Sequence, residues 1–180
     1  MVINVHAGHN PSGKVACGAV GILDESKEAR EVVSYLIKYL KEYGHTVYNC
    51  TVNNGTGQMD VLKKIVTKCN HHKNVKLDIS IHFNSGACDK KGNKKTTGVE
   101  VIVYRRTSKA KSYAQKIVKS ISKLGFTNRG VKTNNSLYYL HHSAAPALLV
   151  ECCFVDDKDD AKLYNAKKMA KAIADAIGKA

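Results

Sequence analysis

The chain has 180 residues, of which 43% are hydrophobic and only two are proline, so we expect a folded domain with a sizeable core and exclude a disordered chain. Its 29 basic and 15 acidic residues give a formal net charge of +14, which favours a polyanionic partner. No apolar run approaches the ~18 residues that a membrane-spanning helix needs. No compact basic run of about five or six residues marks a nucleic-acid patch.

The six cysteines include no C-x-x-C pair, which argues against a thiolate zinc site and favours reduced thiols. The N-terminal segment lacks the basic region and the long apolar stretch of a signal peptide. We therefore expect synthesis in the cytoplasm without a signal peptide.

The first quarter of the chain alternates apolar runs with amphipathic stretches. Residues 2–7 predict a strand, and residues 8–24, rich in glycine and other small residues, predict a loop over its end. Residues 25–43 carry apolar side chains at helical spacing, and Gly44 suits the end of that helix. Residues 45–51 predict a second strand.

The middle of the chain continues this alternation. Residues 59–69 have the apolar spacing of a helix, and residues 77–83 predict a central strand. Residues 84–97 are rich in Gly, Lys and Asn and predict a long loop that borders a substrate groove. Residues 98–104 alternate as a strand does, and residues 108–124 predict another helix.

The last third of the chain has one unassigned stretch, residues 126–140, where the pattern is mixed. Residues 147–151 predict the last strand, and residues 157–164 and 166–178 predict two helical pieces. Strands alternating with helices predict a three-layer α/β fold, with a mostly parallel, twisted sheet of about six strands flanked by helices. We expect one domain over residues 1–180.

Three of the apolar runs end at a metal-capable side chain, namely His9, His82 and Glu151. In an open α/β sheet the ligand crevice lies beyond the carboxyl ends of the strands. The three side chains are therefore expected to converge there, although they lie far apart in sequence. Glu25, which follows the loop that begins near His9, could complete a His-His-Glu set of the kind that binds catalytic zinc.

Each of these residues also has an ordinary structural interpretation when it is taken alone. His9 could face solvent, His82 could be a hydrogen-bonded core histidine, and Glu151 could pair with a lysine. Glu25 could simply stabilise a helix dipole, with Asp24 as the N-cap. Spacing alone leaves these alternatives open.

The whole chain nevertheless resembles the catalytic domain of the zinc-dependent N-acetylmuramoyl-L-alanine amidases, the Amidase_3 family, because several motifs occur in the family's order. These motifs are Ala7-Gly8-His9, Glu25 at the start of the first long helix, Ser80-Ile81-His82-Phe83-Asn84, Gly98-Val99-Glu100, Asn128-Arg129-Gly130-Val131, Leu137-Tyr138-Tyr139-Leu140 and Pro146-Ala147-Leu148-Leu149-Val150-Glu151. The chain departs from the family pattern at Asn10-Pro11 and at Cys152, and neither departure touches an implied ligand.

The resemblance implies that His9, Glu25 and His82 hold one Zn²⁺ and that Glu151 is the catalytic carboxylate. The implied reaction is hydrolysis of the amide between N-acetylmuramic acid and L-alanine in peptidoglycan. Two alternatives remain at this point: a related zinc peptidase that cuts within the stem peptide, and a basic nucleic-acid-binding domain suggested by charge alone.

The implied partner is peptidoglycan, with anionic wall polymers as a further partner for the basic surface. We expect a monomer that neither binds nucleic acid nor inserts into membranes, that acts on the cell wall after release, and that has no separate wall-binding module. Whether it is a phage lysin or a cellular autolysin stays open.

Overall fold

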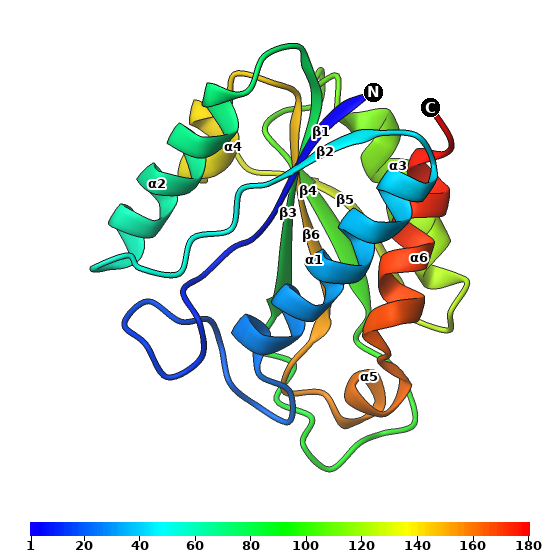
Figure 1. The fold of residues 1–180 in the computed structure, drawn as a ribbon. Coiled ribbons are helices and arrows are strands. Elements are labelled where there is room, and N and C mark those ends of the chain that lie inside the picture. The colour runs from blue at the N-terminus through cyan, green and yellow to red at the C-terminus, as the bar shows by residue number, and fades with distance from the viewer.

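The computed structural model describes residues 1–180 and places six strands in one sheet with helices on both faces (Figure 1). The strands are β1 (Val2–Ala7), β2 (Thr46–Asn49), β3 (Val75–Asn84), β4 (Val99–Val103), β5 (Asn128–Thr133) and β6 (Ala147–Phe154). The helices are α1 (Glu25–Glu42), α2 (Gln58–His71), α3 (Lys111–Ser122), α4 (Tyr138–His142), α5 (Lys158–Leu163) and α6 (Ala166–Ile177). The predicted α/β fold class is confirmed.

The strand order in the sheet is β2-β1-β3-β6-β4-β5, and only the β4–β6 pair is antiparallel. A parallel connection needs a crossover, usually a helix, that returns the chain to the same end of the sheet. Residues 85–98, between β3 and β4, contain no helix. The chain therefore turns back directly, and β4 runs opposite to the strands that precede it.

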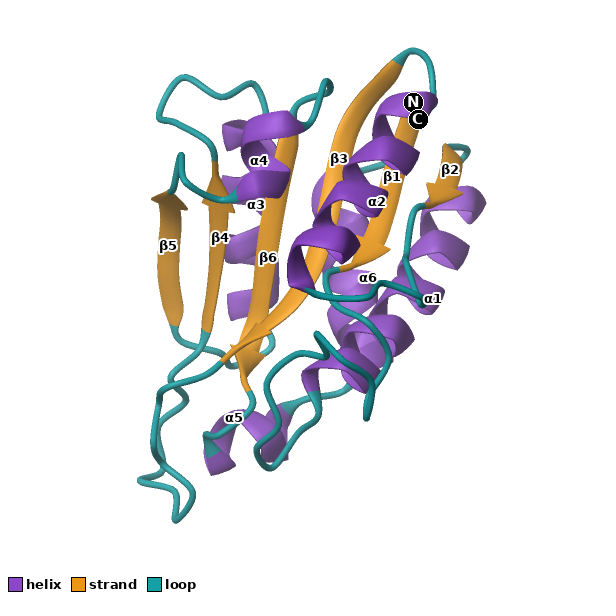
Figure 2. Ribbon diagram, turned by 90° about the vertical axis from the view of Figure 1, so that its left-hand side faces the viewer, coloured by secondary structure: helices purple, strands orange, loops and turns teal.

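The two faces of the sheet are covered unequally. Helices α1, α3 and α6 pack on one face over the main apolar core, whereas α2 and α4 cover part of the other face through a smaller apolar cluster. Figure 2 shows β4, β5 and the carboxyl-terminal part of β6 without a helix in front of them on this second side. In β4, Val99, Val101 and Val103 are buried, while Glu100 and Ile102 are only half-buried. The second face is thus open beside β6.

Most predicted elements occur with boundaries shifted by a few residues. Helix α1 begins at Glu25 as predicted, because the Asp24 side chain accepts a hydrogen bond from the Lys27 amide. Gly44 follows this helix with a φ of 86°, a conformation that glycine adopts at little cost. The unassigned stretch 126–140 contains β5 and the first three residues of α4, neither of which the pattern predicted. None of the helices combines the length and the apolar character needed to cross a membrane.

The long loop 85–98 is fixed by carboxylates that follow β6. Asp156 accepts hydrogen bonds from the backbone amides of Gly86 and Cys88, and Asp160 accepts from the amides of Gly98 and Phe154. These side chains satisfy backbone groups that no strand partner reaches. The loop therefore has a defined course beside the carboxyl ends of β3 and β6.

Candidate metal centre

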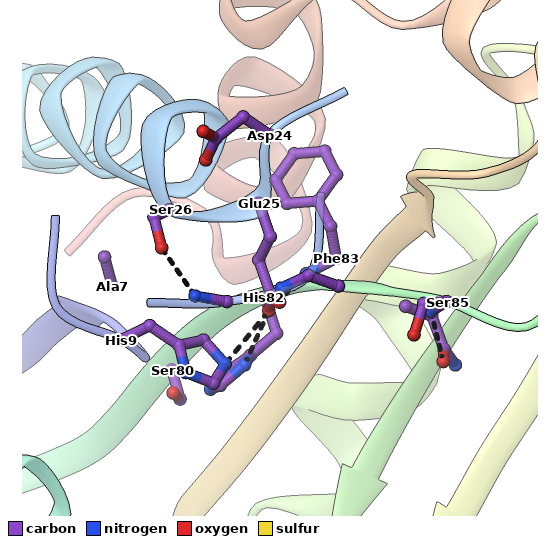
Figure 3. Close-up of polar contacts among 12 residues, drawn as sticks. Ala7, His9, Asp24, Glu25, Ser26, Ser80, His82, Phe83 and Ser85 are labelled. Atoms are coloured by element: carbon purple, nitrogen blue, oxygen red, sulfur yellow. Dashed lines mark hydrogen bonds and ion pairs between the residues drawn. The ribbon is translucent and has the colours of Figure 1, made fainter. Parts of the chain in front are cut away.

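The candidate site lies where β1 and β3 end and α1 begins. His9 lies two residues beyond β1, His82 is near the end of β3, and Glu25 is the first residue of α1. Figure 3 shows the imidazoles of His9 and His82 directed at the Glu25 carboxylate from different parts of the chain. The structure therefore brings together the three residues that the sequence suggested as ligands.

The three side chains are close enough to share one ion. Glu25 Oε1 lies 3.0 Å from His82 Nδ1 and 3.3 Å from His9 Nε2. The two imidazole rings are 4.9 Å apart, centroid to centroid, and nearly perpendicular. Backbone amides fix the carboxylate, since Phe83 N donates to Oε1 and Ala19 N donates to Oε2.

Two glycines allow this close approach. A Cβ on Gly8 would lie 1.9 Å from the His82 ring, and a Cβ on Gly18 would lie 2.4 Å from Glu25 Oε2. No side chain fits at such distances, so both positions require glycine for space. The Gly18 amide also donates to Ser26 Oγ, which ties the loop to the first turn of α1.

The protonation state of the cluster suits a cation. Burial acts to raise the pKa of Glu25, but the contacts with His82 and His9 prevail and hold that pKa well below its usual value. Burial lowers the pKa of His82, and Glu25 offsets this only in part. An ionised carboxylate beside a neutral imidazole is the state that metal binding requires.

The spacing of the ligand atoms fits zinc. The candidate ligand atoms of His9, Glu25 and His82 all lie within 4.8 Å of one another. Tetrahedral zinc with bonds of roughly 2.0–2.2 Å holds its ligand atoms about 3.4 Å apart, close to the separations from Glu25 Oε1. Two histidines and one glutamate leave a fourth position for water, as in catalytic zinc sites.

Glu151 lies beside this cluster with an unpaired oxygen. In the sheet register Glu151 of β6 pairs with His82 of β3 on one side and with Glu100 of β4 on the other. Its Oε2 atom is buried and has no hydrogen-bond partner. Burial, and then the nearby Glu25 and Glu100 carboxylates, raise the pKa of Glu151 to about 8. The carboxyl is therefore suited to exchange a proton near neutral pH.

Sequence reasoning assigned no individual role to a second group of polar residues beside Glu151. Glu100 accepts hydrogen bonds from Asn84 Nδ2 at 3.1 Å and Arg129 Nε at 2.9 Å. The alternation of β4 was the available signal, since it puts Glu100 on the face opposite the buried valines. His6, also on that face, is buried in a small cavity of about 100 Å³ next to His82.

The family comparison agrees with this geometry. The Amidase_3 family, described as N-acetylmuramoyl-L-alanine amidase, matches residues 3–180. The chain belongs to this family.

The similarity to known proteins extends over nearly the whole chain. An uncharacterized protein of Clostridium perfringens strain 13 is 40% identical, over 98% of this chain and 51% of that protein. The catalytic domain of the CD27L endolysin targeting Clostridia difficile has a TM-score of 0.85 at 25% identity, over 98% of this chain and 96% of that chain. Cwp6 from Clostridium difficile has a TM-score of 0.80 at 28% identity, over 98% of this chain and 28% of that chain. The chain spans about half the length of the curated relatives it matches.

The buried Glu151 carboxyl makes a prediction about stability and pH. The folded state holds a proton on Glu151 up to pH about 8, whereas the unfolded chain loses it near the ordinary glutamate value of 4.5. The stability contributed by this group is therefore present at low pH and lost as pH rises through that window. Glu151→Gln cannot ionise, so its free energy of unfolding should rise relative to wild type between those pH values, by on the order of a few kcal/mol.

The measurement is urea unfolding of both proteins in a metal chelator at several pH values from 5 to 8. The chelator matters because a bound cation would itself lower the pKa of a neighbouring carboxyl. A stability difference that stays constant over this range would contradict the unpaired, buried state of Glu151.

Proposed function

We propose that this chain hydrolyses the amide between N-acetylmuramic acid and L-alanine in peptidoglycan, with one zinc ion held by His9, Glu25 and His82. The observation that carries the proposal is the convergence of these three side chains beside the unpaired carboxyl of Glu151, in a chain of the Amidase_3 family. The cluster lies at the edge of the open sheet face, where a polymer can reach it. A zinc ion held by these three residues would supply Lewis acidity, since it would polarise a carbonyl oxygen and lower the pKa of water.

The chain's own residues would orient the reactants and move the proton. Glu25, His9 and His82 would hold the zinc ion in position. The backbone amides of Phe83 and Ala19 hold Glu25 in place. Glu151 takes a proton from the attacking water and delivers it to the amine of L-alanine as the C–N bond breaks. Glu151 must be ionised before it can accept the proton, and a bound cation would favour that state by lowering the pKa that burial raises.

Anionic wall polymers are the second proposed partner. An open groove of about 730 Å³ between α1, α3 and α6 is lined by four lysines, Lys123, Lys167, Lys168 and Lys171. It lies on the helical layer opposite the face that carries Glu151. Phosphate-bearing polymers could hold the protein here while the site remains free to act on peptidoglycan.

The role of Glu151 predicts the behaviour of a conservative variant. Glu151→Gln keeps the shape of the side chain but cannot accept a proton, so hydrolysis of peptidoglycan should fall by about a hundredfold or more. Zinc content should stay unchanged, because Glu151 is not a ligand in this proposal. The measurements are release of soluble products from walls and metal analysis of the same samples.

Two controls make this test specific. Glu42→Gln, at the exposed end of α1, should retain full activity. Mass spectrometry of the wild-type products should find intact stem peptides freed from glycan, whereas a peptidase would leave part of each peptide on the sugar. Wild-type activity in Glu151→Gln would disprove the proposed proton transfer.

The lysine groove predicts salt-dependent binding to walls. The double charge reversal Lys167→Glu and Lys168→Glu should reduce sedimentation with teichoic-acid-bearing walls at low salt, and added salt should weaken wild-type binding, because both reduce attraction to phosphates. Hydrolysis of small soluble substrates should be unaffected. Reversal of the exposed Lys63 and Lys73, near α2, is the control with matched charge. An equal loss of wall binding in the two double variants, or wall binding that does not change with salt concentration, would contradict a role for this groove.

A further inference from the structure

A row of polar side chains crosses the open face of the sheet, beginning at the candidate metal centre. His82 of β3 pairs in register with Glu151 of β6, and Glu151 pairs with Glu100 of β4. Arg129 of β5 extends the row, because its Nε donates to Glu100 Oε2 at 2.9 Å. Neighbouring strands lie about 4.8 Å apart, so the backbone of Arg129 is about 10 Å from that of Glu151.

The local backbone presents Arg129 on this face. The pairing of β4 with β5 shifts register between Val99 and Val101, opposite Arg129 and Gly130. Gly130 has a φ of 83°, which glycine tolerates. Such bulges redirect side chains and are common next to active sites. This register shift explains why the side chain of Arg129, on the edge strand β5, lies against Glu100 of β4.

The guanidinium of Arg129 is held in place, but not all of its N–H donors are hydrogen-bonded. It contacts Glu100 through Nε only, and it lies over the Phe154 ring at 5.0 Å. Glu100 is itself held by Asn84. The two Nη groups of Arg129 make no hydrogen bond within the chain, and 37% of the side chain is exposed to solvent. A rigid fork of N–H donors is thus left facing the open side of the sheet.

Such a fork is suited to bind a carboxylate. Arginine binds carboxylates through two parallel N–H donors, with more geometric selectivity than lysine. Two of the surrounding side chains, Glu25 and Glu100, are carboxylates that would repel an acidic substrate. Arg129 is a cation in this row of side chains, and the N–H donors of its two Nη groups are free to bind a substrate.

The substrate of the proposed reaction carries an acidic group at a matching distance. In peptidoglycan the residue after L-alanine is D-glutamate, whose α-carboxyl is free in some walls and amidated in others. An extended chain advances about 3.3–3.6 Å per residue, which places this carboxyl about 7 Å beyond the scissile amide. Arg129 Nε contacts Glu100, which is the register neighbour of Glu151, so we expect the Arg129 fork to lie about this far from the reacting bond.

From this arrangement we propose that Arg129 binds the α-carboxylate of the D-glutamate residue and makes the chain selective for stem peptides in which that group is free. The proposal rests on the proposed amidase function. It makes Arg129 a specificity residue, since it contacts substrate away from the reacting bond.

The test compares two soluble muropeptides that differ only at this position, one with D-glutamate and one with D-isoglutamine. Wild type should hydrolyse the free acid with a kcat/KM about tenfold higher or more, mainly through KM, because a charged hydrogen-bonded pair is lost with the amide. Arg129→Gln should reduce this ratio to about one. Arg129→Lys should keep part of the preference, because it retains the charge without the fork.

Lys132→Gln is the matched control. Val131 packs against the main core, so alternation along β5 directs Lys132 to the same open face as Arg129, where it pairs with Ile102 and not with Glu100. Removing this charge should leave the preference for D-glutamate intact. Circular dichroism melting curves verify that each variant is folded.

The outcomes separate this inference from the function on which it rests. If wild type cleaves neither muropeptide, the amidase function fails. If wild type cleaves both equally well, or if Arg129→Gln lowers both rates by the same factor, the carboxylate role is overturned. A merely structural role in pairing with Glu100 would affect the two substrates alike.

Discussion

The candidate site depends on one carboxylate that is shared by two imidazoles. Glu25 Oε1 lies within 3.3 Å of a nitrogen of both His9 and His82, although the three residues come from a loop, a helix and a strand. Two imidazoles and a carboxylate packed this closely are costly to bury unless charges and donors are satisfied. Backbone amides satisfy part of that demand, and a divalent cation would satisfy the rest. The site therefore depends on the packing of α1 against the sheet edge, because this packing places Glu25 between the two histidines.

The parallel strands explain why distant residues meet. Because β1, β3 and β6 run in the same direction, their carboxyl ends lie at one edge of the sheet. His82 and Glu151 become register partners on neighbouring strands for this reason. The antiparallel β4 then brings Glu100 to the same level from the opposite direction. One mixed sheet thus lines up a candidate ligand, a candidate proton carrier and a fixed acid–arginine pair.

Much of this could be predicted from the sequence where burial imposes a pattern. The strands β1, β3 and β6 are buried apolar runs, and α1 has both a helical stripe and an N-cap at Asp24, so all four were predicted. The edge strand β5 was not, because its sequence, Asn128 to Thr133, is largely polar and interrupted by Gly130 at an irregular pairing. An edge strand of this kind has one paired neighbour and no buried face that would impose alternation.

The detailed geometry of the site could not be predicted from the sequence. Gly8 and Gly18 were visible as loop residues, but their need for empty space depends on the positions of His82 and Glu25 in the folded chain. The Glu100–Arg129 pair joins residues 29 apart in sequence through a register shift. The alternation of β4 places Glu100 on its face of the sheet, but the pairing with Arg129 follows from tertiary packing.

The most direct test of the account is zinc X-ray absorption and metal analysis on the chelator-stripped chain after it is reloaded with zinc. The account predicts one zinc per chain with nitrogen and oxygen neighbours at about 2.0–2.2 Å. That zinc should be lost in His82→Ala and retained in His71→Ala, which changes an exposed histidine of α2. Full zinc occupancy in His82→Ala, or sulfur neighbours at about 2.3 Å, would contradict it.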